Sequence, residues 1–272
     1  MKTKIKTQEL LYFLLWSCEQ LSRPTFRNVS ESFEAWAYRN GFHRQLAELE
    51  RLELVESQRP ADGRFGNYDR VLRLTEPGRL EALGGRDPEV CWKRSWDGQW
   101  RLALFDLPVA RSTERDRLRR YLRHRGFGYL QNSVWISPGP LEKENETLTG
   151  CRINVESFIL LEARPSAGET DQDLVAGAWD FEEINASYAM HLETLAARPV
   201  GQLHNESDAR AFYVWAGKER TAWLTAVSQD PLLPERLLPE HYLGRQAWFS
   251  RKNTLAQAAE QANSFRWSAP DK

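Results

Sequence analysis

The segment from Arg94 to Glu142, RSWDGQWRLALFDLPVARSTERDRLRRYLRHRGFGYLQNSVWISPGPLE, decides the fold of the middle of the chain. Its apolar pattern predicts a strand, a basic amphipathic helix and two short strands, over Trp100–Phe105, Thr113–Arg125, Phe127–Gln131 and Val134–Ser137. A weak helix over Leu141–Leu148 and a strand over Val155–Glu162 follow. This βαββαβ order predicts a ferredoxin-like domain over residues 90–165.

The segment before Arg94 predicts helices, a hairpin and a further short helix. Helices are expected over Thr7–Ser22, from Asn28 or Ser30 to about Arg39, and from Phe42 to Leu52. Strands at Leu54–Ser57 and Arg70–Leu74 flank a loop rich in Pro, Gly, Asp and Asn, and Thr75 caps the helix that begins EPGRLEAL. This order is that of a winged helix-turn-helix domain, which we predict over residues 1–86.

The C-terminal third predicts helices. Helical periodicity extends over Asp173–Ala197, and two more helices are expected around a proline-punctuated loop. We therefore predict a mostly helical domain over residues 170–265, and an α+β fold class for the three-domain chain.

Composition excludes several classes of protein. The 272 residues have a formal net charge of -1 and 41% hydrophobic residues, which is ordinary for a globular protein. The three cysteines form no cluster, so no disulfide framework or zinc site is expected. Neither a signal peptide nor an apolar run long enough to span a bilayer is recognisable, which predicts a cytoplasmic protein with no membrane partner.

Several motifs resemble one known family. WDGQWRLALFD and GFGYLQNSVWISP in the middle, Trp179-Asp180 with Ile184-Asn185, and a later segment, Asp230-Pro231 through Leu243-Gly244, are similar to motifs of PaaX-type transcriptional repressors. The later segment resembles that family's DPxLPxxLLPxxxxG pattern. The resemblance implies a repressor of aromatic-acid catabolism that binds a double-stranded DNA operator, usually as a homodimer.

In the best-known family members the effector is an aryl-acyl-CoA thioester, phenylacetyl-CoA. The resemblance therefore implies an acyl-CoA-type effector and no bound cofactor. No CoA pocket can be assigned to named residues, and the aromatic-rich segment SESFEAWAYRNGF departs from a typical family head.

The third predicted helix is the candidate recognition helix, and the hairpin loop after it is the candidate wing. One face of the helix carries His43, Arg44, Gln45 and Arg51, and the loop carries Arg59, Arg64, Tyr68 and Arg70. Arginine can contact guanine or phosphate, and glutamine can contact adenine. The alternative is that these residues only form a solvated helix face and hairpin tip.

Charge is distributed unevenly. Residues 101–130 carry eight basic and three acidic residues, whereas residues 160–210 carry three basic and ten acidic residues. The basic helix could contact DNA backbone or an anionic ligand. We favour the alternative that its arginines pair with the acidic Asp173–Glu183 region of the same chain or of a partner.

Two other classes of function remain open. Asp106 ends the first strand of the predicted ferredoxin-like domain, which also resembles CRISPR-associated nucleases, so a metal-dependent nuclease is one alternative. A protein-interaction module is the other. No catalytic motif or metal-ligand set is recognisable, and the histidines are scattered. An aromatic group is expected to form cores, or else an effector pocket: Trp92, Trp96, Trp100, Trp135, Trp179, Tyr188, Trp215, Trp223 and Trp248.

Overall fold

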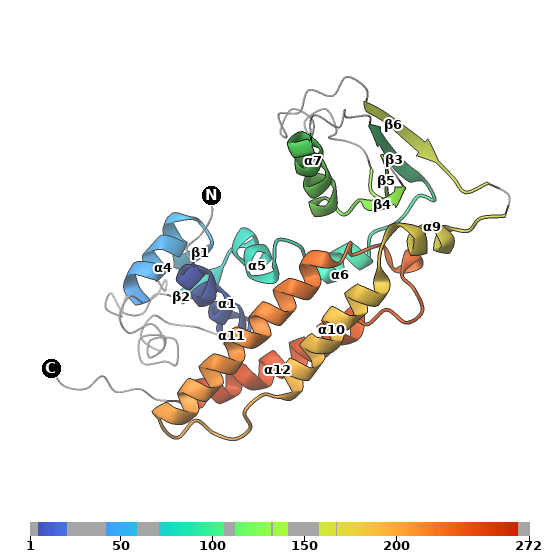
Figure 1. Ribbon diagram of the computed structural model, residues 1–272. Coiled ribbons are helices and arrows are strands. Elements are labelled where there is room, and N and C mark those ends of the chain that lie inside the picture. The colour runs from blue at the N-terminus through green and yellow to red at the C-terminus, as the bar shows by residue number, and fades with distance from the viewer. Residues whose placement is uncertain are drawn as a thin grey trace. The chain divides into compact units, whose positions relative to one another are not determined.

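The structure, a computed structural model, describes residues 5–20, 42–58, 71–105, 112–131, 133–140, 158–166 and 168–265. The chain divides into two compact units (Figure 1). One is drawn from Met1–Asp87, Tyr188–Leu224 and Gly244–Lys272, and the other from Pro88–Ser187 and Thr225–Leu243. The three-domain division predicted above stays a prediction, because compactness does not test which segments fold independently.

Among the described residues, three helices and a hairpin form the N-terminal part of the first unit: α1 (Ile5–Gln20), α4 (Phe42–Arg51), β1 (Val55–Gln58), β2 (Val71–Leu74) and α5 (Glu76–Leu83). Leucines at helical spacing bury one side of α1, and α4 buries Leu46 and Leu49. The strands pair antiparallel, with Val55 opposite Leu74. These elements confirm the predicted first and third helices and both strands to within two residues. The predicted second helix lies outside the described residues, and the winged helix-turn-helix assignment stays a prediction.

Thr75 caps α5, as predicted. Its Oγ1 accepts a 3.1 Å hydrogen bond from the Gly78 backbone N–H and donates a 2.6 Å bond to the Glu53 carbonyl. A Cβ at Gly78 would lie 1.9 Å from the Leu54 carbonyl oxygen. Only glycine therefore allows α5 to lie this close to the residue before β1.

The C-terminal helices are α10 (Phe181–Ala196), α11 (Glu206–Gln229) and α12 (Gly244–Ser264), and the last two confirm the predicted helix–loop–helix order. The segments of these helices that belong to the first unit pack on the N-terminal elements. The Tyr213 hydroxyl donates to Glu9 of α1 at 3.2 Å, and Trp223 Nε1 donates to the Leu83 carbonyl of α5 at 3.3 Å. Since α1 also contacts α12, the predicted DNA-binding elements and these helices share one packed unit.

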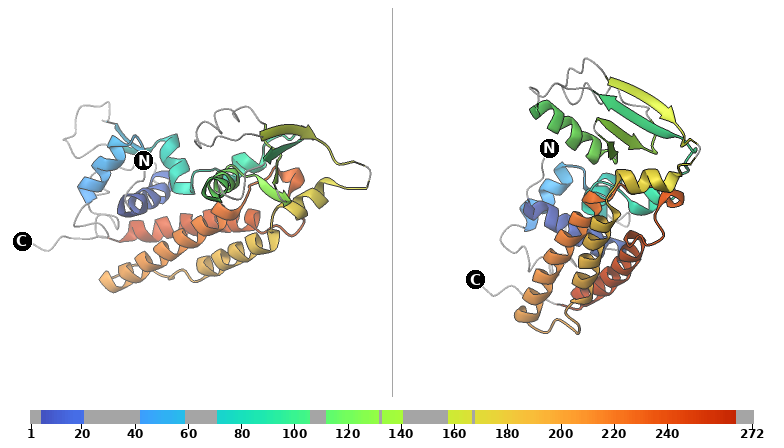
Figure 2. Two further views of the ribbon diagram at one scale, coloured as in Figure 1. Left: turned by 45° about the horizontal axis from the view of Figure 1, so that its top comes forward. Right: turned by 45° about the vertical axis from the view of Figure 1, so that its right-hand side comes forward.

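An antiparallel sheet of order β4-β5-β3-β6 is the centre of the second unit (Figures 1 and 2). Its elements, with two helices, are α6 (Pro88–Trp92), β3 (Trp100–Phe105), α7 (Ser112–His124), β4 (Gly128–Gln131), β5 (Val134–Ser137) and β6 (Phe158–Ala163). α7 covers one face, where Leu118 and Leu122 pack with Trp135. The described elements follow the predicted ferredoxin-like order. The helix expected over Leu141–Leu148 lies outside the described residues.

The other face of the sheet is partly covered. α9 (Asp171–Ala178) and a short 3-10 helix, η2 (Glu235–Leu237), pack against Trp100 and Ile136. β6 forms one edge of the described sheet, and its Ile159 and Leu161 are half exposed. Together, the two units confirm a mixed helix-and-sheet, α+β fold class.

The single helical segment expected over Asp173–Ala197 is two helices instead. α9 ends at Ala178, and Trp179 takes an extended backbone conformation with φ −133° and ψ 137°. Asp180 Oδ1 then accepts a 3.0 Å hydrogen bond from the Glu183 backbone N–H, which caps the start of α10. The break turns the chain at the wall of a cavity.

Candidate functional site

α4 carries the described residues that were predicted to contact DNA bases. Leu46 and Leu49 attach the helix to its core, and His43 and Arg44 in the first turn are exposed. A recognition helix requires this division between a buried apolar side and an accessible polar side. The geometry is compatible with base contact by His43 and Arg44, which stays a prediction.

Gln45 is not on the exposed side of α4, and that part of the sequence interpretation is wrong. Only 7% of its surface is exposed, because it lies one helical turn before Leu49 and shares its buried side. Its Oε1 is buried and has no hydrogen-bond partner among the described residues. Contact between Gln45 and a base edge would require this side chain to leave its buried position.

Arg51 lies on the exposed side of α4 but is paired within the helix. Its Nε and Nη2 donate to both carboxylate oxygens of Glu48, at 2.8 and 2.7 Å. The hydrogen bonds and charge of Glu48 raise the pKa of Arg51 above its ordinary value. Phosphate contact by Arg51 would therefore compete with an intrahelical ion pair.

The predicted wing residues lie outside the described part of the chain. This holds for Arg59, Arg64, Tyr68 and Arg70, which all fall between β1 and β2. The described strands β1 and β2 bring the two ends of that segment together, since Gln58 pairs with Val71. Contact of these four residues with DNA stays a prediction.

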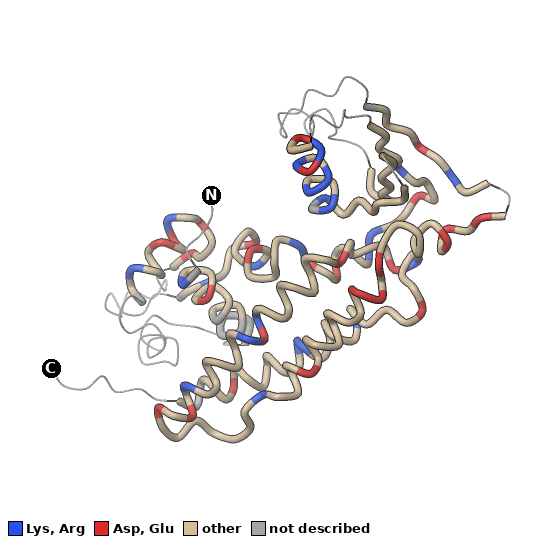
Figure 3. The backbone as a smooth tube through the Cα atoms, in the orientation of Figure 1, with Lys and Arg blue, Asp and Glu red and all other residues tan. Residues whose placement is uncertain are grey.

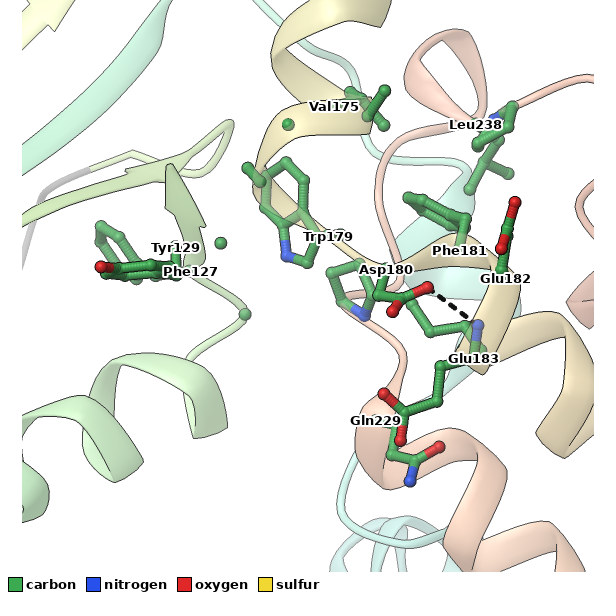
Figure 4. Close-up of a pocket in the computed structure, with 18 of the residues that line it drawn as sticks. Phe127, Tyr129, Val175, Trp179, Asp180, Phe181, Glu182, Glu183, Gln229 and Leu238 are labelled. Atoms are coloured by element: carbon green, nitrogen blue, oxygen red, sulfur yellow. Dashed lines mark hydrogen bonds between the residues drawn. The ribbon is translucent and has the colours of Figure 1, made fainter. Parts of the chain in front are cut away.

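A cavity of about 1460 Å³ lies within the second unit (Figure 4). Its walls come from the α7–β4 segment, the α9–α10 junction and the loop after α11. The apolar wall consists of Phe127, Tyr129, Val175, Trp179, Phe181 and Leu238. Of the nine aromatic residues proposed from sequence as alternative pocket residues, only Trp179 lines this cavity. The others are mostly buried in cores, as the favoured interpretation expected.

The absence of a side chain at Gly128 positions Trp179. A Cβ at Gly128 would lie 2.5 Å from Cε2 of Trp179 and 2.7 Å from Cβ of Ala178. α9 can therefore rest directly on the backbone of β4, and the indole lies beside the strand, as Figure 4 shows. The indole Nε1 is buried and has no hydrogen-bond partner in the described part of the chain, which leaves one donor at the cavity wall.

The cavity lining is negatively charged. It contains five carboxylates and one guanidinium: Asp173, Asp180, Glu182, Glu183, Glu240 and Arg123. The Asp173 carboxylate accepts hydrogen bonds from the Thr170 hydroxyl and backbone N–H, at 2.6 and 2.8 Å, and these bonds lower its pKa. Because Asp173 and Asp180 both cap helices, part of this charge has a structural role. The net negative charge of the lining nevertheless disfavours ligands that carry several phosphates.

A second cluster of ionisable groups is fully buried, in the first unit. Glu219 Oε1 accepts a 2.9 Å hydrogen bond from Arg251 Nε and lies 2.9 Å from His191 Nε2. Burial, with the charge of Arg251, lowers the pKa of His191 to about 3, and burial raises the pKa of Glu219. The scattered histidines in the sequence did not indicate this network, in which the structure places His191.

No metal site is evident among the described residues. No three His, Cys, Asp or Glu side chains in that part of the chain lie close enough to hold an ion. Asp106, on which the nuclease alternative depends, lies outside it. Likewise, no described helix is long and apolar enough to cross a membrane.

Comparison with known proteins supports one family. Residues 93–175 match the PaaX protein central Cas2-like domain, and residues 179–267 match the PaaX-like protein C-terminal domain. The transcriptional repressor PaaX of Escherichia coli (strain K12) is 29% identical over 205 residues, which cover 72% of this chain and 61% of that relative. The match thus spans about three fifths of the relative's length.

A solved structure has a similar fold. It is the uncharacterized protein Rv0674 from Mycobacterium tuberculosis, with a TM-score of 0.58 at 22% identity, over 93% of this chain and 95% of that one. At this identity the likeness concerns the fold alone.

Proposed function

This chain belongs to the PaaX family, and we propose that it is a sequence-specific DNA-binding transcriptional repressor, active as a homodimer in the cytoplasm. The observation that carries the proposal is the division of α4 into a side seated by Leu46 and Leu49 and an exposed first turn with His43 and Arg44. That turn precedes the β1–β2 hairpin, in the order of a winged head. The repressor named PaaX in Escherichia coli supports the same proposal by similarity.

Binding of a small molecule to the cavity is the second part of the proposal. The volume of the cavity exceeds that of typical ligand sites, so a small molecule has room to bind. Trp179, Phe127 and Phe181 offer aromatic surface for it. The ligand would regulate repression if it preferred one arrangement of the two heads. The excess of carboxylates makes a small aromatic effector a better match to this cavity than the acyl-CoA that the family resemblance implies.

Two alternatives are distinguished by specific variants. A metal-dependent nuclease should cleave DNA with Mg²⁺ or Mn²⁺ and lose that activity in Asp106→Ala. A protein-interaction module should keep its function after charge reversal at Arg44 and Arg64, whereas a repressor should lose operator binding.

The direct test is binding to the DNA upstream of the chain's own gene, against unrelated duplex of equal length. We expect preferential binding to the upstream DNA, and Arg44→Ala should weaken it by about 1–3 kcal/mol. Arg210→Ala, which removes an exposed arginine of α11, is the matched control and should have little effect. Equal, weak binding of the wild type to both duplexes would refute the repressor proposal.

The ligand part of the proposal has a separate test. Ala176 is exposed and lines the cavity, so Ala176→Trp should fill space there, whereas Ala197→Trp adds the same side chain after α10, outside the cavity. Phenylacetate, benzoate and phenylacetyl-CoA would be titrated by calorimetry. Binding of an aryl acid that is lost in Ala176→Trp and kept in Ala197→Trp supports the cavity. No binding, or equal binding by both variants, argues against it.

A further inference from the structure

α7 carries the largest concentration of positive charge in the described chain. Residues 112–125 contain six arginines and two acidic residues, while the whole chain has a net charge of -1. Figure 3 shows basic positions along the length of this helix, with acidic positions only near its start. Such a cluster attracts anionic partners unless its charge is neutralised within the protein.

The fold directs several of these arginines outward, whereas Arg115 and Arg119 are only partly exposed. Leu118 and Leu122 occupy the buried side of α7, where they pack on the sheet. Arg117, Arg120 and Arg123 consequently lie on exposed positions, spaced three residues apart. The helix has no exposed leucine, valine, isoleucine or aromatic residue among its described side chains.

The protein does not neutralise this charge in its described residues. Arg120 Nε donates to the Asp116 backbone carbonyl at 3.4 Å, and Arg125 Nε donates to the Tyr121 hydroxyl at 3.1 Å. The guanidinium of Arg123 lies 5.7 Å from the centre of the Trp135 ring. None of these partners is a carboxylate.

The pairing with acidic residues of the same chain, which we favoured from sequence, is also absent among the described residues, and pairing with a partner chain stays a prediction. No ion pair joins the described residues of α7 to Asp173–Glu183, although both belong to the second unit. Among the described side chains, Arg117 and Arg120 of α7 therefore keep their charge available on the surface.

We propose that the exposed side of α7 is a second DNA contact surface, which binds the phosphate backbone of duplex DNA without reading its sequence. Arginine donors form a planar fork that matches phosphate oxygens, and the rise of a helix spreads Arg117, Arg120 and Arg123 over about 9 Å, which is the span of several phosphates. The proposal goes beyond the repressor function, since it assigns affinity, and not specificity, to the second unit.

Other anionic partners fit this surface less well. A helix that binds a membrane surface inserts an apolar face, and here that face is buried in the protein core. A protein partner would need apolar or aromatic anchors at the centre of the contact, and the exposed side of α7 offers charged and small polar side chains. Arginine without apolar neighbours is the pattern expected for backbone phosphates.

The test is the salt dependence of DNA binding by the full chain. Affinity for upstream DNA and for unrelated duplex would be measured by fluorescence anisotropy over a range of NaCl concentrations. Each phosphate contact contributes about 0.9 to the slope of log K against log salt. Arg117→Gln with Arg120→Gln should therefore lower the slope by up to about 1.8 on both duplexes, with the preference between them unchanged.

Two controls make this result specific. Arg210→Gln with Lys218→Gln removes two exposed cations from α11 and should leave the slope at its wild-type value. Arg117→Lys with Arg120→Lys retains the charges and should keep most of the slope. Because Arg117 and Arg120 are exposed, all variants should unfold at the wild-type temperature.

Each outcome decides between the proposals. A wild-type slope in the α7 glutamine variant overturns the α7 surface, even if upstream DNA is still preferred. A reduced slope without preference for upstream DNA supports the surface and overturns the repressor proposal. Unchanged DNA binding with lost binding to phosphatidylglycerol vesicles would assign α7 to a membrane instead. No duplex binding by the wild type would overturn both proposals.

Discussion

The guanidinium of Arg251 lies 4.6 Å from the centre of the Trp223 ring, so a positive charge rests on an aromatic face inside the protein. The same guanidinium lies 5.5 Å from the Tyr12 ring and donates to Glu219. Arg251 and Glu219 are both almost fully buried. The contact between α1, α11 and α12 thus depends on a pair of charges that have no access to water.

Removing one charge of this pair should be costly. We expect Arg251→Met to destabilise the protein by about 3–5 kcal/mol, because the buried Glu219 loses its cationic partner and keeps only the contact with His191. Arg251→Met combined with Glu219→Gln should recover most of the loss. Urea unfolding measures both variants, and a loss of under about 1 kcal/mol in the single variant would contradict this account.

The low pKa of His191 predicts a dependence of stability on pH. The unfolded histidine binds a proton near pH 6.5, and the folded one only near pH 3, so protonation favours the unfolded state between these values. The His191 contribution is therefore complete above pH 6.5 and is lost as the pH falls toward 3.

The matched variant is His191→Gln. Glu219 has a raised pKa, so its own effect on stability with falling pH is opposite to that of His191, and this effect is present in both proteins and cancels in the comparison. Relative to this variant, the wild type should lose up to about 1.4 kcal/mol for each pH unit below 6.5. Urea unfolding at several pH values measures the difference. A constant difference between the proteins would show that His191 titrates normally.

The contact between Gly128 and Trp179 predicts a steric effect. Gly128→Ala should destabilise the second unit by about 1–3 kcal/mol and move Trp179 at the cavity wall, because the new Cβ would overlap the indole. Gly139→Ala is the control, since its Cβ would meet only Ser137 Oγ, at 3.5 Å. Thermal unfolding compares the two, and equal effects would speak against this packing.

A stabilising change is expected within α11. Gly217 lies in the helix interior, and a Cβ there would meet nothing within 4 Å. Gly217→Ala should stabilise the protein by about 0.5–1 kcal/mol. Gly201→Ala has the same open space but a φ of +97°, so it should be destabilising. Opposite signs in urea unfolding are the expected result.

Local signals account for the elements that the sequence predicted well. β3 and β5 match their predicted bounds because strand alternation is strong in WRLALF and VWIS. The start of α5 follows from Thr75, whose hydroxyl satisfies a backbone N–H. Each of these features depends on residues that are close in sequence.

Two errors arose where a local signal had two interpretations. Trp179 preserved the apolar periodicity across the α9–α10 break, although Asp180 is a typical helix-capping residue. Gln45 was placed on the polar side because its side chain is polar, although its spacing from Leu49 places it on the buried side.

Features formed by distant segments could not be predicted. The cavity combines residues near Phe127, Trp179 and Leu238, and nothing in their local pattern indicates that they meet. The same holds for His191, 28 residues before Glu219 in the chain, and for Arg251, 32 residues after it.

The edge of the sheet at β6 has a consequence for handling the protein. Ile159 and Leu161 point to the same face of this edge strand and are 50% and 47% exposed. An edge strand that carries apolar side chains, as β6 does in the described sheet, is a template on which a second chain can add its own strand. Concentrated or warmed samples should therefore aggregate through this edge. Ile159→Lys should slow this aggregation.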